Sequence, residues 1–160
     1  MPHVATYADK TELAYRQLDA FVGHWSMEGQ QYDSPFGPPA KITALNTYEW
    51  LPGGFFLVHR LEGRLGGQEM ACIEVMGYDA SSDTYSTHSF YNDGSTNLWQ
   101  SNERNGSRTL TGHWRKAGED LKVRCTTVFA EDCQSMTANW EYSRDGLKWQ
   151  PFMATTATKA

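Results

Sequence analysis

Residues 96–142 decide the fold, and they read TNLWQSNERNGSRTLTGHWRKAGEDLKVRCTTVFAEDCQSMTANWEY. Short runs in which polar and apolar residues alternate are separated here by turn-forming pairs. These pairs are Asn105-Gly106, Ala117-Gly118 and Asp132-Cys133. Alternation with a period of two is typical of half-buried β-strands, and such pairs favour tight hairpin turns. The stretch therefore predicts consecutive antiparallel strands with one apolar face.

The turns also predict which residues share a face, because a two-residue turn fixes the pairing of the strands that it joins. The orientation can be carried through five hairpins, from Asp93-Gly94 to Asp145-Gly146. One face then holds His88, Phe90, Asn97, Trp99, Trp114, Leu121, Val123, Cys125, Thr127, Phe129, Trp140, Trp149 and Met153. The other face holds Thr109, Thr111, His113, Lys122, Arg124, Thr126, Thr137, Asn139 and Glu141. A sheet with one apolar face must close or stack to bury it.

A similar turn at Pro52-Gly53 predicts the inward residues of the preceding hairpin. It places Trp50 opposite Phe55, Tyr48 opposite Leu57, and Asn46 opposite His59. The next turn, within residues 64–67, has two interpretations. An odd-length turn puts Ile73 and Val75 inside and Glu74 outside, whereas an even-length turn brings Glu74 and Cys72 inside. We expect the odd-length turn, because it agrees with the register carried back from His88.

The 160 residues are enough for one domain with an ordinary core, which we assign to residues 1–160. We expect a short helix over about residues 10–22, with Thr11 as its cap and Gly23 at its end. An up-and-down β-barrel of about ten antiparallel strands follows over about residues 24–158. The segment Asp33–Pro39, DSPFGPP, is predicted to be a loop at a barrel mouth.

Composition narrows the classes of function. The formal net charge is −5 and no basic stripe is present, so the sequence does not predict nucleic-acid binding. No apolar run is long enough for a membrane span, and the N-terminus does not resemble a secretory leader. Three cysteines without metal-ligand spacing favour free thiols in a reducing compartment, so a cytoplasmic protein is expected.

Several segments resemble a known family. The triplet Gly23-His24-Trp25 is similar to the GxW signature of calycins. The longer segments are LDAFVGHW, TYEWLPGGFFLVHR, EVMGYD and MTANWEYSRDGLKWQPFM. Together they resemble an uncharacterised bacterial domain-of-unknown-function family with a calycin or lipocalin-like barrel, over nearly all of the chain after about residue 13. The resemblance implies about ten strands, with Trp25 closing one end and Lys159 packing over it. It implies little about activity.

A more distant similarity is to nitrobindin-type barrels, which bind haem through a histidine near the C-terminus. The final segment here, WQPFMATTATKA, has no histidine. No haem, and no other cofactor, is therefore predicted.

The candidate ligand-binding residues are the inward aromatic side chains and the few polar groups among them. They are Asn46, Tyr48, Trp50, Leu57, His59, His88, Phe90, Asn97, Trp99, Trp114, Trp140 and Met153. His59 is the foremost polar candidate, either orienting a ligand or acting as a general base. Equally, it can be a core histidine bonded to Asn46. No metal site is predicted, since His59 and His88 lack a third ligand.

Three functions are compatible with these residues. The first is binding of a small apolar or amphipathic molecule among the tryptophans. The second is a cofactor-independent isomerase or cyclase with His59 as base. The sequence supports a protein without enzymatic activity better than it supports this enzyme. In the third, the rings fill the barrel completely and the protein acts as a homodimeric interaction protein.

Overall fold

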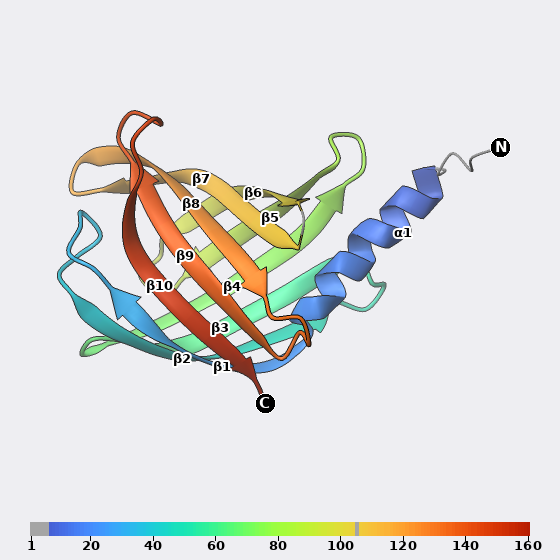
Figure 1. The fold of residues 1–160 in the computed structure, drawn as a ribbon, viewed down its shortest axis with the longest axis horizontal. Coiled ribbons are helices and arrows are strands. Elements are labelled where there is room, and N and C mark those ends of the chain that lie inside the picture. The colour runs from blue at the N-terminus through green and yellow to red at the C-terminus, as the bar shows by residue number, and fades with distance from the viewer. Residues whose placement is uncertain (1–6, 105) are drawn as a thin grey trace.

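The computed structural model describes residues 7–104 and 106–160 as a closed barrel of ten antiparallel strands with one helix at one end, on the right in Figure 1. The helical elements are α1 (Tyr7–Leu18) and the 3-10 turn η1 (Asp19–Phe21). The strands are β1 (Gly23–Gln31), β2 (Ala40–Trp50), β3 (Phe56–Leu65), β4 (Gln68–Asp79), β5 (Thr84–Tyr91), β6 (Thr96–Arg104), β7 (Ser107–Lys116), β8 (Glu119–Phe129), β9 (Ser135–Ser143) and β10 (Gln150–Lys159). Each strand pairs with its chain neighbour, and β1 pairs with β10 to close the barrel. The predicted all-β barrel is confirmed. The helix begins at Tyr7, so position 11 lies within it rather than at its cap.

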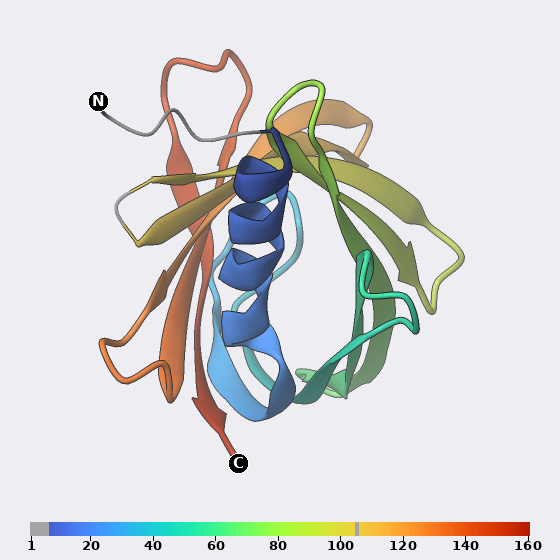
Figure 2. The same ribbon diagram turned by 90° about the vertical axis from the view of Figure 1, so that its right-hand side faces the viewer.

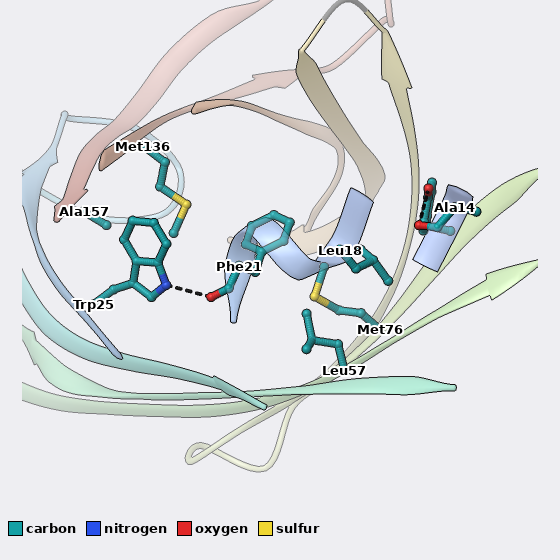
Figure 3. Close-up of a cluster of buried hydrophobic side chains, with 9 residues drawn as sticks. Ala14, Leu18, Phe21, Trp25, Leu57, Met76, Met136 and Ala157 are labelled. Carbon is teal, nitrogen blue, oxygen red and sulfur yellow. Dashed lines mark hydrogen bonds between the residues drawn. The ribbon is translucent and has the colours of Figure 1, made fainter. Parts of the chain in front are cut away.

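The helix covers one opening of the barrel, as Figure 2 shows. Leu18 and Phe21 are buried in one cluster with Trp25, Leu57 and Met76 (Figure 3). The Trp25 indole donates from Nε1 to the Phe21 carbonyl oxygen at 2.7 Å, and Lys159 Nζ lies 5.4 Å from the centroid of the Trp25 ring. A tryptophan thus seals this end from inside, fixed by a hydrogen bond to the segment that covers it.

The opposite end is closed by the loop between β1 and β2, on the left in Figure 1. Phe36 from this loop stacks on Phe152, with ring centroids 4.1 Å apart, and meets Trp114 and Tyr142 edge-on. These rings belong to a second cluster that also holds Trp99, Leu121, Val123 and Trp140. The prediction of a mouth loop at Asp33–Pro39 is therefore correct, and its phenylalanine enters the barrel.

The register predicted for the second half of the chain is largely confirmed. The paired residues are Ser101 with Leu110, Trp114 with Leu121, Cys125 with Trp140, and Phe129 with Met136. Asn105, one half of a predicted turn pair, lies outside the described residues. Trp149 is a correction, because it lies on the outer face against the Arg124 guanidinium, 4.1 Å from its ring centroid. An irregularity between Pro151 and Met153 shifts the register of β10, and Phe152 is buried instead.

The predicted facing of β5 is wrong by one residue. The loop around Asp93-Gly94 holds three residues, because Tyr91 N donates to Ser95 O and Phe90 pairs with Thr96. Gly94 has φ of +87°, as the glycine of such a loop requires. A shift of one residue turns every side chain to the other face. His88 is therefore exposed and Phe90 is half exposed, while Thr87 and Ser89 are buried.

The turn between β3 and β4 has an even length, whereas we expected an odd length. Leu65 pairs with Gln68, so the turn has the even length of two residues, Gly66 and Gly67. Glu74 consequently faces inward opposite His59, while Ile73 is 40% exposed. Cys72 also faces inward, opposite Leu61.

The hairpin at Pro52-Gly53 has a longer loop than predicted, and Leu51 N donates to Phe56 O across it. Tyr48 therefore pairs with His59 and Trp50 with Leu57, two residues away from the predicted partners. An even shift preserves the facing, so Asn46, Tyr48, Leu57 and His59 remain inside as predicted.

We expect Gly112→Ala to destabilise the barrel, because a Cβ at this position of β7 would lie 2.5 Å from Cε3 of the Trp99 ring. Trp99 is 0% exposed and cannot move away freely. Overpacking of this kind costs about 1–3 kcal/mol of unfolding free energy. Urea unfolding followed by tryptophan fluorescence measures the loss. Gly67→Ala is the matched control, since a Cβ added there would meet nothing within 4 Å, and equal stability of the two variants would contradict the prediction.

Candidate functional site

Five neighbouring strands each contribute one inward side chain to a continuous chain of hydrogen bonds. The members are Asn46 on β2, His59 on β3, Glu74 on β4, Ser89 on β5 and Trp99 on β6. We call this set the polar belt. It runs along the inner wall between the cluster under the helix and the cluster at the Phe36 end. Adjacent strands place inward residues side by side, which is why one residue from each strand suffices.

The belt has a definite order of donors and acceptors. Trp99 Nε1 donates to Ser89 Oγ at 3.1 Å, and the Ser89 hydroxyl donates to Glu74 Oε2. Glu74 Oε1 lies 2.7 Å from His59 Nδ1, and His59 Nε2 lies 2.7 Å from Asn46 Oδ1. A carbonyl oxygen only accepts, so His59 donates from both ring nitrogens. The belt then contains an imidazolium paired with a carboxylate. This arrangement leaves the interior without a net buried charge, which would be costly.

The surroundings favour the ionised form of Glu74. Burial alone would raise the pKa of this carboxyl group, but the hydrogen bond from His59, the charge of His59 and the hydrogen bond from Ser89 outweigh it. The pKa of Glu74 is held below its ordinary value. A carboxylate that accepts two hydrogen bonds inside the barrel is thus stabilised by its neighbours on both sides.

Tyr48 borders the belt on the helix side. Its ring is parallel to the His59 imidazole, with centroids 4.1 Å apart, and contacts Phe21 on the helix side of the barrel. Burial, and then the nearby Glu74, raise the pKa of Tyr48 well above its ordinary value. Within residues 7–104 and 106–160, its hydroxyl group has no hydrogen-bond partner. The phenol therefore stays protonated and retains a free donor.

The two inward thiols near the belt are poor nucleophiles. Burial, and then the Glu74 charge, raise the pKa of Cys72, and burial raises the pKa of Cys125 to about 12. Since the thiolate is the reactive form, neither cysteine is activated at neutral pH. His59 is likewise engaged at both ring nitrogens, so it can accept a proton from a substrate only after the belt rearranges.

Two buried polar atoms lack a hydrogen-bond partner among the described residues, Asn46 Nδ2 and Thr87 Oγ1. Asn46 is 3% exposed, and its carbonyl oxygen is already occupied by His59. An unpaired buried donor costs about 1–3 kcal/mol, and native structures hold few of them. Asn46 Nδ2 thus leaves the end of the belt unsatisfied.

Several inward side chains beside the belt keep accessible surface. Glu74 lies in the middle of β4 and faces inward, and yet its side chain is 19% accessible. Inward side chains around it are also only partly buried, among them Tyr48, Trp114, Trp140 and Met153. A side chain at mid-strand inside a closed barrel keeps accessible surface only where a water-sized space adjoins it.

Most of the predicted site residues are brought together inside the barrel. Asn46, Tyr48, Trp50, Leu57, His59, Trp99, Trp114, Trp140 and Met153 belong to the belt or to the two clusters that flank it. His88 and Phe90 do not, because β5 presents its other face. Asn97 is half-buried, and its amide bonds within the wall to His113 O and Leu98 N, so it offers no free group.

Sequence reasoning missed Glu74 and Ser89. The signal that could have found them is the predicted inward facing of His59 and Asn46, because buried polar side chains need hydrogen-bond partners. An even-length turn at Gly66-Gly67 faces Glu74 inward, opposite His59. Ser89 then follows as the residue beside Glu74 on the next strand. The two-residue turn assumed at Asp93-Gly94 hid this, because it turned His88 and Phe90 inward in place of Ser89.

Two shallow surface hollows, of about 460 and 490 Å³, lie elsewhere. Residues of β1 and its neighbours line them, including the outward Glu28, Lys41 and Thr156. Neither contains a belt residue, so we place the candidate site inside the barrel, where polar groups are buried and unsatisfied. In the described part of the chain, no three potential metal ligands gather, and no helix is long and apolar enough to cross a membrane.

Comparison with known proteins agrees with the fold. A family model described as a protein of unknown function, DUF1579, matches residues 11–159. The chain belongs to the DUF1579 family. The predicted resemblance to an uncharacterised family is thereby confirmed, and family membership by itself assigns no activity. No curated protein matches.

A solved structure with a similar fold is that of Rv2717c from M. tuberculosis. The TM-score is 0.65 at 12% sequence identity, over 92% of this chain and 97% of that chain. At this identity the likeness extends to the fold alone.

We expect Glu74→Gln to lower the free energy of unfolding by about 3–5 kcal/mol near neutral pH, because it leaves the buried His59 without its carboxylate. The folded-state pKa of Glu74 is depressed, so its contribution is present above the ordinary value of 4.5 and is lost as pH falls through the folded value. The stability difference between wild type and variant should therefore shrink under acid conditions.

Thermal unfolding across a pH series, from neutral down to the acid limit of folding, checks this. The control is Glu62→Gln, which removes a carboxylate from the outer face of β3. A constant offset between wild type and Glu74→Gln at every pH would contradict the ionised pair.

Proposed function

We propose that this protein binds one small, largely apolar molecule inside the barrel, with the polar end of the molecule at the belt. The observation that carries the proposal is the accessible surface of Glu74, deep inside the wall, next to partly buried rings. A space bordered by large aromatic side chains and a few fixed polar groups is typical of small-molecule sites.

The walls offer the ligand flat apolar surface. The Trp99 ring meets Trp114 and Trp140 edge-on, each with a centroid distance of 5.7 Å. Met153, which is flexible and polarisable, lies in the same cluster. Rings held by one another provide a rigid surface, so little side-chain entropy is lost when a ligand packs on them.

Binding is better supported than either alternative. A filled, purely structural interior would leave no accessible surface on Glu74. Base catalysis by His59 requires a free ring nitrogen, and both nitrogens are bonded. We also propose a cytoplasmic setting, on the ground that all three cysteines are free and two of them are buried.

We expect the neutral probe N-phenylnaphthylamine to gain fluorescence on mixing with the protein, because its emission rises in apolar surroundings. Ala138→Phe should weaken this binding by about tenfold or more, which is about 1.4 kcal/mol. Ala138 pairs with Thr127 on the inner wall and is partly accessible there, so the added ring occupies the proposed space.

Asn139→Phe is the matched control, since it adds the same ring to the exposed outer face of β9. Binding should survive this change. If the wild type does not raise the fluorescence, or if both variants bind as wild type does, the proposed function is wrong.

A further inference from the structure

We infer that the barrel selects a neutral ligand that carries a carbonyl group, and that Asn46 Nδ2 donates the hydrogen bond that recognises it. The inference rests on the proposed function and names the chemical class of its ligand. Its observations are the unpaired Nδ2 atom of a side chain that is 3% exposed and the unpaired hydroxyl of Tyr48.

The structure orients the Asn46 amide with its oxygen toward the histidine. Asn46 Oδ1 lies 2.7 Å from His59 Nε2 and accepts a hydrogen bond from it. The Asn46 NH₂ group is turned away from the histidine and can bond only to something that the chain itself does not provide.

The two unpaired groups on the inner face of β2, the Asn46 NH₂ group and the Tyr48 hydroxyl, can both donate a hydrogen bond. Asn46 and Tyr48 lie two residues apart on the inner face of β2, so both belong to the same patch of wall. The acceptors of the belt are occupied, because Glu74 already accepts from His59 and Ser89. A carbonyl oxygen, with two lone pairs and no hydrogen, matches this set. An amine or an alcohol also brings a hydrogen that needs an acceptor, and the Asn46 NH₂ group is not one.

Charge excludes anionic ligands from the same place. The basic side chains that are buried among the described residues are His59 and Arg108. His59 is paired with Glu74, and Arg108 is paired with Glu103 at 2.9 Å. A ligand carboxylate would therefore enter beside Glu74 without a cation of its own, at a large desolvation cost.

The test is competition of matched aromatic ligands against N-phenylnaphthylamine. Acetophenone and ethylbenzene have nearly the same shape and differ by a carbonyl oxygen in place of two hydrogens, and benzoate adds a charge. We expect acetophenone to bind about tenfold more tightly than ethylbenzene and benzoate to bind most weakly. In Asn46→Leu, the acetophenone to ethylbenzene affinity ratio should fall to about one.

The ratio of the acetophenone and ethylbenzene affinities is measured within one variant, so general damage to the fold affects both affinities and leaves the ratio unchanged. Thr87→Val is the control, because it removes the other unpaired buried polar atom and should leave the ratio unchanged. Should Asn46→Leu fail to fold, NMR of wild type replaces it. The Asn46 side-chain NH₂ resonances should move with acetophenone and stay in place with ethylbenzene.

The outcomes separate the two proposals. Equal affinity for acetophenone and ethylbenzene, tighter binding of benzoate, or a ratio that depends on Thr87 instead of Asn46 overturns the carbonyl inference while ligand binding stands. Failure of every ligand, including N-phenylnaphthylamine, removes the proposed function and this inference with it.

Discussion

The constraint on which the interior depends is that one carboxylate, Glu74, lies inside a closed apolar barrel. A buried charge needs a partner and hydrogen bonds, and the neighbouring strands supply them as His59 and Ser89. His59 then requires Asn46, and Ser89 is reached by Trp99. Five strands are thus tied at one level of the barrel. A slip of one residue in any of these hairpins would expose a belt member and bury an outward side chain in its place.

The alternation of side chains between the two faces of a strand, with a period of two residues, explains how much of the fold the sequence could predict. Turns such as Ala117-Gly118 have the expected length, and the pairing carried across them agrees with the structure. At Asp93-Gly94, the loop has one residue more than a two-residue turn, which inverted our facing of β5. That error then favoured an odd-length turn before β4, because β4 pairs with β5 and its facing was inferred from that of β5. Glu74 was therefore expected on the outer face. The residues of the turns alone cannot reveal such a pair of errors. The need of a buried His59 for a hydrogen-bond partner at each ring nitrogen can reveal them, because the inward facing of Glu74 supplies the partner of Nδ1.

The two ends of the barrel show why the candidate site lies in the middle. At one end, Trp50 Nε1 bonds to Asp19 and the Tyr85 hydroxyl bonds to the Ala14 carbonyl, so the polar atoms of the covering helix and of the rings beneath it satisfy one another. At the other end, Phe36 fills the mouth with an apolar stack. Both ends are complete as packing arrangements. Unsatisfied groups occur between them, where the belt passes partly exposed aromatic walls.

Stability alone does not account for the belt. Apolar side chains of similar volume commonly stabilise a core as well as a buried ion pair does, or better. The belt also ends in an amide donor that nothing in the described chain satisfies, at a cost of about 1–3 kcal/mol. An incoming acceptor would remove that cost, and the imidazolium–carboxylate pair would hold the Asn46 amide in the orientation that receives it. The proposed recognition of a ligand accounts for this arrangement, because a hydrogen bond from Asn46 favours a ligand of matching polarity over one that is merely apolar.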